Sequence, residues 1–185
     1  TQDITVLFSD LSGFTKMSEE QGAETVAEFL NDYLTVMNET IFANNGTIDK
    51  FIGDAIMVLF GAPQDMSPQE QVRRATECAE SMQNAMAELT KGWSHSDSKN
   101  LAMRIGIHHG QAVVGNFGSA QRSDYTAIGP SVNLAARIET AAEPGHVFVS
   151  EATAKLLDPD RTCKAGDYAL KGIEGKVRLH KMVRS

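Results

Sequence analysis

The chain has 185 residues, of which 42% are hydrophobic and 22% are charged, and its formal net charge is −7. This size and composition are typical of one globular domain with a substantial core. The negative charge argues against a nucleic-acid polymer as a partner, because binding to a phosphate backbone needs a basic surface. It does not exclude a small phosphorylated ligand held by a few local cations.

No apolar run is long enough to span a membrane and no signal peptide is present, so we expect a cytoplasmic location and no membrane contact from this domain. The two cysteines, Cys78 and Cys163, lie far apart in the sequence. Cys78 falls on the apolar stripe of a predicted helix, which favours a buried thiol over a disulfide. Because the chain starts without Met and enters a strand almost at once, we expect residues 1–185 to be a single domain excised from a longer parent chain with upstream regulatory domains.

Apolar periodicity and turn residues predict the secondary structure in chain order. The first half is expected to contain a strand at 4–9, a short helical region opening at 12–15, a helix over 23–42, a hairpin of strands at 47–52 and 55–60, and a helix that begins at the capping box of residues 67–70. A polar surface loop is expected over 91–100. The second half is expected to contain strands at 101–108, 112–117 and 123–128, a helix over 129–142, a strand at 146–149, a short helix near 151–157, and closing strands near 163–170 and 176–183.

This order of elements predicts an α+β fold with a ferredoxin-like βαββαβ core and appended strands. In such a core the central hairpin lies beside the end of the first strand. We therefore expect Asp54, in the hairpin turn, to lie next to Asp10, at the end of the first strand. Either acid alone would more often be a turn residue or a helix cap. Together they offer the hard oxygen ligands that Mg²⁺ prefers, and Mg²⁺ commonly binds with phosphate.

Two further groups of residues could serve a phosphorylated ligand. Ser12-Gly13-Phe14-Thr15 would offer backbone N–H groups at a helix start, where anionic oxygens bind. Asn133 and Arg137 are four residues apart on a predicted helix and share a face, among small residues that would let a ligand or a second subunit come close. Taken alone, this pair would more often be the solvent face of an amphipathic helix.

Four segments resemble the catalytic domain of class III nucleotide cyclases, the adenylyl and guanylyl cyclase family: FSDLSGFT at 8–15, KFIGDAIMVLFG at 50–61, MRIGIHHG at 103–110 and YTAIGPSVNLAARIE at 125–139. The likeness runs from about residue 3 to LKG at 170–172. The resemblance implies the cyclase fold and the conversion of ATP to 3′,5′-cyclic AMP and pyrophosphate. The ribose 3′-hydroxyl would attack the α-phosphate in line, with two divalent cations as cofactors.

The resemblance also implies roles for individual residues. Asp10 and Asp54 match the two aspartates that bind two Mg²⁺ or Mn²⁺ ions, and the Leu11 backbone carbonyl matches a further metal ligand. The backbone of Gly13, Phe14 and Thr15 matches the segment that binds the triphosphate in this family.

Arg137 matches the arginine that stabilises charge at the reacting phosphate, and Asn133 matches the asparagine that orients the ribose. Lys171 matches a lysine that contacts the terminal phosphates, although a lone loop lysine is ordinarily just a solvated charge. Arg104 lies on a family motif as well, and we expect it to have a structural or supporting role.

Two positions are implied to select the base. Lys50 matches the purine-reading lysine of adenylyl cyclases, where guanylyl cyclases usually have Glu; a lysine donates hydrogen bonds, and adenine N1 accepts one. Alone, Lys50 could equally be a strand-edge charge. Many adenylyl cyclases have Asp where this chain has Thr126, which resembles the bicarbonate-responsive soluble subgroup. Because a hydroxyl can donate as well as accept, we expect ATP preference with weaker rejection of GTP than an Asp would provide.

In this family the metal-binding aspartates come from one subunit, and the base selectors, Asn and Arg come from the other. This chain contains both halves, so the resemblance implies a homodimer with two active sites at the interface. The alternatives are a guanylyl cyclase and a catalytically silent cyclase-like module that only dimerises or binds nucleotide. A diguanylate cyclase would have a Gly-Gly-acid-Glu-Phe hairpin, and an RNA-recognition domain would have aromatic sheet motifs and a basic surface; this chain has neither.

Overall fold

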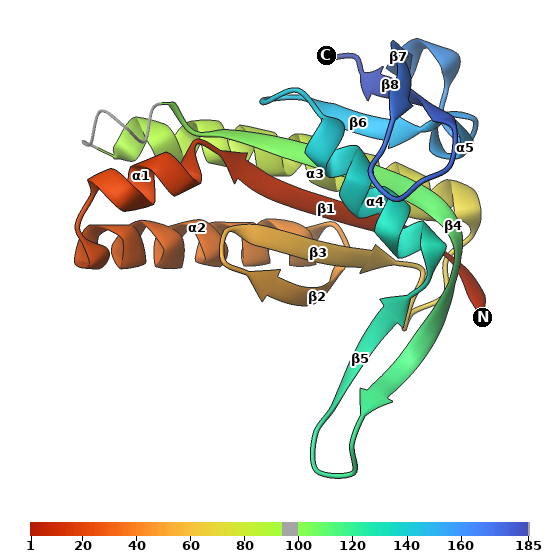
Figure 1. Cartoon of the computed structure of the whole chain (residues 1–185), viewed down its shortest axis with the longest axis horizontal. Helices are drawn as coiled ribbons and strands as arrows, with labels where there is room; N and C mark the ends of the chain where they lie inside the picture. Colours follow the sequence, from red (N-terminus) through yellow and green to blue (C-terminus); the bar gives the residue numbers. More distant parts are fainter. Residues whose placement is uncertain (94–99, 185) are drawn as a thin grey trace.

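A single mixed sheet organises the chain, and helices cover both of its faces (Figure 1). The computed structural model describes residues 1–93 and 100–184. The strand order is β2-β3-β1-β4-β6-β8-β7, and β5 pairs with the far part of β4. The strands are β1 (Gln2–Ser12), β2 (Thr47–Ile52), β3 (Ala55–Phe60), β4 (Ala102–Gly118), β5 (Ser123–Ile128), β6 (Val147–Ser150), β7 (Thr162–Ala169) and β8 (Lys176–Met182).

The helices follow the same order along the chain as the sequence predicts. They are α1 (Phe14–Glu20), α2 (Ala23–Ala43), α3 (Pro68–Gly92), α4 (Pro130–Ala141), α5 (Glu151–Ala154) and the 3₁₀ helix η2 (Pro159–Arg161). With β1 paired to both β3 and β4, the segment order β2-β3-β1-β4 is that of a ferredoxin-like core, with β6, β8 and β7 appended. The predicted α+β fold is therefore confirmed.

Alternation along β1 assigns its side chains to the two faces of the sheet. Leu7 and Leu11 join the core formed with α2 and α3, whereas Ile4 and Val6 join a second core against α4. Cys78 is a free thiol buried in the first core, as expected, and Cys163 is also free and is exposed. Within the residues described, no helix has the length and apolar character to span a membrane.

The predicted boundaries fail around β4. The strands expected at 101–108 and 112–117 are one strand, because β4 pairs with β1 as far as Ala112 and then continues as the partner of β5. Gly110 is not a turn: a Cβ there would lie 2.5 Å from Ser131 Oγ, so the glycine allows α4 to approach the strand closely. The loop expected at 91–100 begins later, since α3 extends to Gly92, and residues 94–99 lie outside the described part of the chain.

Candidate functional site

Asp10 lies within β1, two residues before the strand ends, and not at its last position as the sequence suggested. Its position in the alternation places its side chain on the face of the sheet that α4 covers, together with Val6 and Phe8. Only 21% of the Asp10 side chain is exposed. A carboxylate held this way needs a positive partner, because burying an unpaired charge is costly.

Asp54 is brought to Asp10 by the β2–β3 turn. Gly53, with φ 61°, provides the left-handed backbone of that turn. Asp54 Oδ2 accepts a hydrogen bond from the Leu11 backbone N–H at 2.8 Å, so the carboxylate lies against the residue that follows Asp10. The predicted meeting of the two acids is therefore confirmed. Since the N–H and C=O of one strand residue point to the same side, the Leu11 carbonyl faces the same edge as Asp54.

The electrostatic environment of Asp54 disfavours its charged form. Burial raises the pKa of Asp54 above its ordinary value, and the Asp10 carboxylate adds to the increase, while the hydrogen bond from Leu11 and the charge of Arg104 oppose it. Two acids that share a partly buried edge repel each other when both are ionised. A cation between them would remove that repulsion, so this edge suits a cation.

Arg104 is the cationic partner of Asp10. The two residues face each other across β1 and β4, and Arg104 donates from Nε to Asp10 Oδ1 at 2.9 Å and from Nη2 to Asp10 Oδ2 at 2.5 Å. The supporting role expected for Arg104 takes the form of a two-pronged ion pair with a predicted metal ligand.

Glu139 is a site residue that sequence reasoning missed. It lies on α4, is 8% exposed, and its Oε1 lies 3.7 Å from Arg104 Nε. Burial, followed by the nearby Asp10 carboxylate, raises the pKa of Glu139 to about 9. The available signal was its spacing, since Glu139 falls four residues after the buried Ala135 and therefore on the helix face that meets the sheet.

Asn133 and Arg137 lie on α4 but on the side away from the aspartates. Asn133 is exposed and Arg137 is partly exposed, whereas Glu139, two residues further on, faces Asp10. Side chains two residues apart on a helix point about 200° apart. Among the residues that the structure describes, none forms a hydrogen bond or ion pair with the Arg137 guanidinium. The chain therefore does not bring Arg137 together with its own Asp10 and Asp54.

Lys50 and Thr126 come together on a different part of the sheet. Thr126, on β5, is 8% exposed, and its hydroxyl donates to the carboxylate of Asp49, the neighbour of Lys50 on β2. In Figure 1 the β2–β3 turn lies near α1, whereas β5 approaches the opposite end of the same hairpin. The two base-selecting candidates thus lie together, because both contact the Asp49 carboxylate.

The remaining candidates are on exposed backbone segments. Gly13, with φ 88°, is the N-cap of α1, which begins at Phe14 and has Thr15 exposed in its first turn. Lys171 is exposed in the loop between β7 and β8; the preceding Leu170 packs in a cluster with Ile138 of α4. The Lys171 loop is therefore associated with α4, whereas the Gly13 segment directly follows Asp10 and Leu11.

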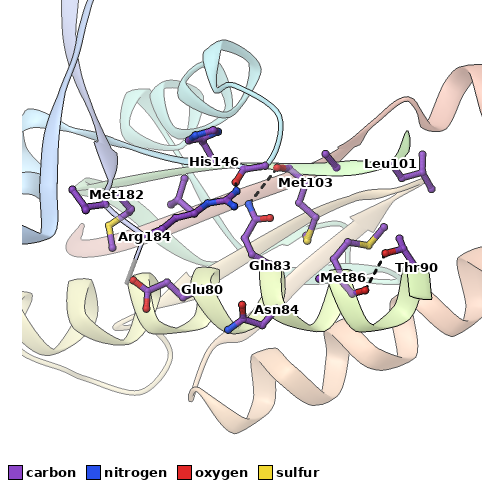
Figure 2. Close-up of a pocket in the computed structure, with 15 residues that line it drawn as sticks. Glu80, Gln83, Asn84, Met86, Thr90, Leu101, Met103, His146, Met182 and Arg184 are labelled. Carbon is purple, nitrogen blue, oxygen red and sulfur yellow. Dashed lines mark hydrogen bonds between the residues drawn. The ribbon is translucent and has the colours of Figure 1, made fainter. Parts of the chain in front are cut away.

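A cavity of about 420 Å³ lies apart from these residues. Its walls are α3, the start of β4, the start of β6 and the end of β8. Figure 2 shows Gln83 of α3 reaching across it, with its amide donating to the Met103 carbonyl at 3.2 Å. None of the predicted site residues lines it. Met103 belongs to the core on the α2 and α3 side, so this cavity is on the opposite face of the sheet from Asp10.

Comparison with known proteins identifies the family to which this arrangement belongs. The model described as the adenylate and guanylate cyclase catalytic domain matches residues 1–183. The chain belongs to the class III nucleotide cyclase family. Among curated relatives, an adenylate cyclase of Anabaena cylindrica is 39% identical over 163 residues, which are 85% of this chain and 31% of that protein. Adenylate cyclase 1 of Rhizobium meliloti is 33% identical over 138 residues, 75% of this chain and 20% of that protein.

This cyclase domain thus spans between a fifth and a third of the length of these curated relatives. Among solved structures, the adenylyl cyclase CyaB from P. aeruginosa superposes with a TM-score of 0.91 at 38% identity, covering 99% of this chain and 94% of that chain. The guanylyl cyclase Cya2 superposes with a TM-score of 0.87, also at 38% identity, covering 98% and 91%. Because identity is equal for an adenylyl and a guanylyl cyclase, it does not decide which nucleotide this domain uses.

Proposed function

We propose that this domain is an adenylyl cyclase that converts ATP to 3′,5′-cyclic AMP and pyrophosphate with two divalent cations, Mg²⁺ or Mn²⁺. The observation that carries the proposal is the meeting of Asp10 and Asp54 through the Leu11 amide, on the edge of a cyclase fold. The 33–39% identity to proteins named adenylate cyclase supports the same class of reaction.

The residues at this edge fit divalent cations. Asp10 and Asp54 provide carboxylate oxygens, the Leu11 carbonyl faces the same edge, and burial together with the Asp10 carboxylate raises the pKa of Asp54, which a bound cation would counteract. When bound, the cations would activate the ribose 3′-hydroxyl as a nucleophile and neutralise the triphosphate. The backbone of Gly13, Phe14 and Thr15, next in the chain, would hold the phosphate oxygens.

Side chains of α4 and of the β7–β8 loop would complete the site from the other subunit. The Arg137 guanidinium would stabilise charge at the α-phosphate, Asn133 would orient the ribose, and Lys171 would contact the terminal phosphates. A preorganised donor of this kind contributes about 10²–10³ in rate. Because Arg137 points away from Asp10 of its own chain, the proposal needs a second copy.

Exposed apolar side chains support such a homodimer. Phe51 and Ile52 at the end of β2 are 41% and 63% exposed, and Val113 and Ile128, which pair across β4 and β5, are 45% and 48% exposed. Neighbouring exposed apolar side chains, such as Phe51 with Ile52 and Val113 with Ile128, are typical of an interaction surface. A twofold arrangement would use the same surface on both copies and create two equivalent sites.

ATP is the proposed substrate because Lys50 offers only donors to the base. The test is product analysis with purified protein, offering ATP and GTP separately with Mg²⁺ and with Mn²⁺. We expect cyclic AMP as the main product and expect Lys50→Glu to lose ATP cyclisation. Cyclic GMP as the main product would favour the guanylyl cyclase alternative that the likeness to Cya2 keeps open.

Failure to form either product, in a folded dimer, would favour a silent module. Addition of bicarbonate to the same assay tests the response that the Thr126 subgroup suggests; an increase in rate is expected if that likeness extends to regulation.

A further inference from the structure

The contact between Asp49 and Thr126 joins two strands that are far apart in the chain. In β2 the pairing with β3 shifts between Ile48 and Lys50, so Asp49 has no partner of its own in the ladder. Such a bulge re-aims a side chain. Here the Asp49 side chain is only 1% exposed although β2 lies at the edge of the sheet, and its carboxylate accepts the hydrogen bond from Thr126.

The same carboxylate also faces Lys50. Asp49 Oδ1 lies 3.7 Å from Lys50 Nζ, while Asp49 Oδ2 accepts from the Thr126 hydroxyl. Both residues proposed to read the base are therefore held by one buried acid. Asp49 itself is covered, so it does not present its oxygens to a ligand as Lys50, with 45% of its side chain exposed, can present its ammonium group.

This contact determines which hydrogen bonds Thr126 can offer. A hydroxyl has one hydrogen to donate and lone pairs that accept, whereas an ionised carboxylate only accepts. The Thr126 hydrogen is committed to Asp49, so the oxygen can only accept from a ligand. Lys50 can only donate. The pair thus presents one acceptor and one donor of fixed polarity, whereas the sequence alone left the Thr126 hydroxyl free to donate.

The Thr126 acceptor and the Lys50 donor complement the hydrogen-bonding edge of adenine but not that of guanine. The 6-amino group of adenine donates and its N1 accepts, while the 6-oxo group of guanine accepts and its N1–H donates. Resting on the proposed function, in which Lys50 and Thr126 read the base, we propose that Asp49 is a specificity-determining residue that holds the Thr126 hydroxyl as an acceptor and thereby selects ATP over GTP.

The test compares the ratio of kcat/KM for ATP to kcat/KM for GTP in the wild type and in Asp49→Asn. An Asn side chain can donate to Thr126, which frees the hydroxyl to donate to a 6-oxo group. We expect the ATP/GTP ratio to fall about tenfold, the effect of one reversed hydrogen bond, chiefly through better use of GTP. Asp32→Asn, at an exposed position of α2, removes the same charge and should keep the wild-type ratio.

A double-mutant cycle separates this role from support of Lys50 or of the fold. Thr126→Val removes the hydroxyl with little change in shape. In the Thr126→Val background, Asp49→Asn should leave the ATP/GTP ratio unchanged. An unchanged ratio for Asp49→Asn alone, or an equal fall in both backgrounds, would overturn the proposal.

Two measurements keep the proposal testable if Asp49→Asn does not fold or if no product forms. Wild-type protein should use ITP, which has the 6-oxo group and N1–H but no 2-amino group, as poorly as GTP. Use of ITP as efficient as that of ATP would refute the proposal.

If neither ATP nor GTP is cyclised, the proposed function fails, but the binding of 3′-deoxy-ATP and 3′-deoxy-GTP can still be measured by calorimetry with Mn²⁺. Wild type should then prefer the adenine analogue and Asp49→Asn should lose that preference; equal preferences in both proteins would contradict the role of Asp49.

Discussion

Arg104 holds both carboxylate oxygens of Asp10 across the β1–β4 ladder, at 2.5 and 2.9 Å. The guanidinium therefore neutralises the acid that, by the proposal, also binds a divalent cation. Glu139, 3.7 Å from Arg104 Nε, offers the guanidinium a second carboxyl group. Arg104 and a divalent cation would compete for Asp10.

Replacing Arg104 with Gln should therefore tighten the binding of Mn²⁺. In the wild type, Mn²⁺ must displace the hydrogen-bonded ion pair between Arg104 and Asp10. In Arg104→Gln this cost is absent, so we expect the affinity for Mn²⁺ to rise by about tenfold. Calorimetric titration with Mn²⁺ measures the change. Arg178→Gln, which removes an exposed ion pair with Asp167 at 3.0 Å, is the matched control and should leave Mn²⁺ affinity as it is. Unchanged or weaker binding by Arg104→Gln would show that the two cations do not compete.

Gly106 controls how closely α4 approaches β4. A Cβ at this position would lie 2.3 Å from Glu139 N, 2.7 Å from Glu139 Cα and 2.9 Å from the Ala135 carbonyl oxygen, all of which are helix backbone. Gly106→Ala should therefore displace α4, reduce the free energy of unfolding by about 2–3 kcal/mol and lower the cyclase rate through Asn133 and Arg137.

Urea unfolding and initial rates of the Gly106→Ala variant test this expectation. Gly92→Ala is the control, because no atom of the described residues lies within 4 Å of a Cβ at that position, the last of α3. Wild-type stability and rate in Gly106→Ala would contradict this expectation, because α4 would then move without a loss of unfolding free energy or activity.

His108 should make stability depend on pH. Burial, with a smaller effect from His109, lowers the pKa of His108 from 6.5 to about 4, and its Nδ1 lies 2.7 Å from Ser150 Oγ. The unfolded chain therefore binds more protons than the folded chain between these values. Stability is fully present above about pH 6.5 and decreases as the pH falls toward 4, by about 3 kcal/mol in total.

Urea unfolding at a series of pH values from 7.5 to 4 checks the His108 prediction. His108→Gln should lose most of this dependence of stability on pH. His146→Gln, in a partly exposed turn, is the control and should retain it. Equal slopes for wild type and His108→Gln would assign the acid sensitivity to other groups.

The sequence predicted the meeting of Asp10 and Asp54 because local signals determine it. The Gly53-Asp54 turn and the order of elements are readable from residue types, and a ferredoxin-like core then places the turn beside β1. The contact of Asp49 with Thr126 was not predictable, because it depends on a bulge in β2 and on how the β4–β5 arm bends.

Glu139 was missed for a related reason. An acid near the end of an amphipathic helix ordinarily faces water, but here the close packing of α4 on β4, which Gly106 allows, accompanies the burial of Glu139. The continuity of β4 was hidden in the same way, since Gly110 is a point of close packing against Ser131 and not a turn. Tertiary packing, absent from local patterns, decides each of these cases.

The most direct test of the account is to mix two inactive variants, Asp54→Ala and Arg137→Ala. If each active site takes its aspartates from one subunit and its arginine from the other, mixed dimers contain one intact site. Random exchange of equal amounts should then restore about a quarter of wild-type activity. Complete absence of activity in the mixture, with both variants shown to be folded and to exchange subunits, would contradict the shared site.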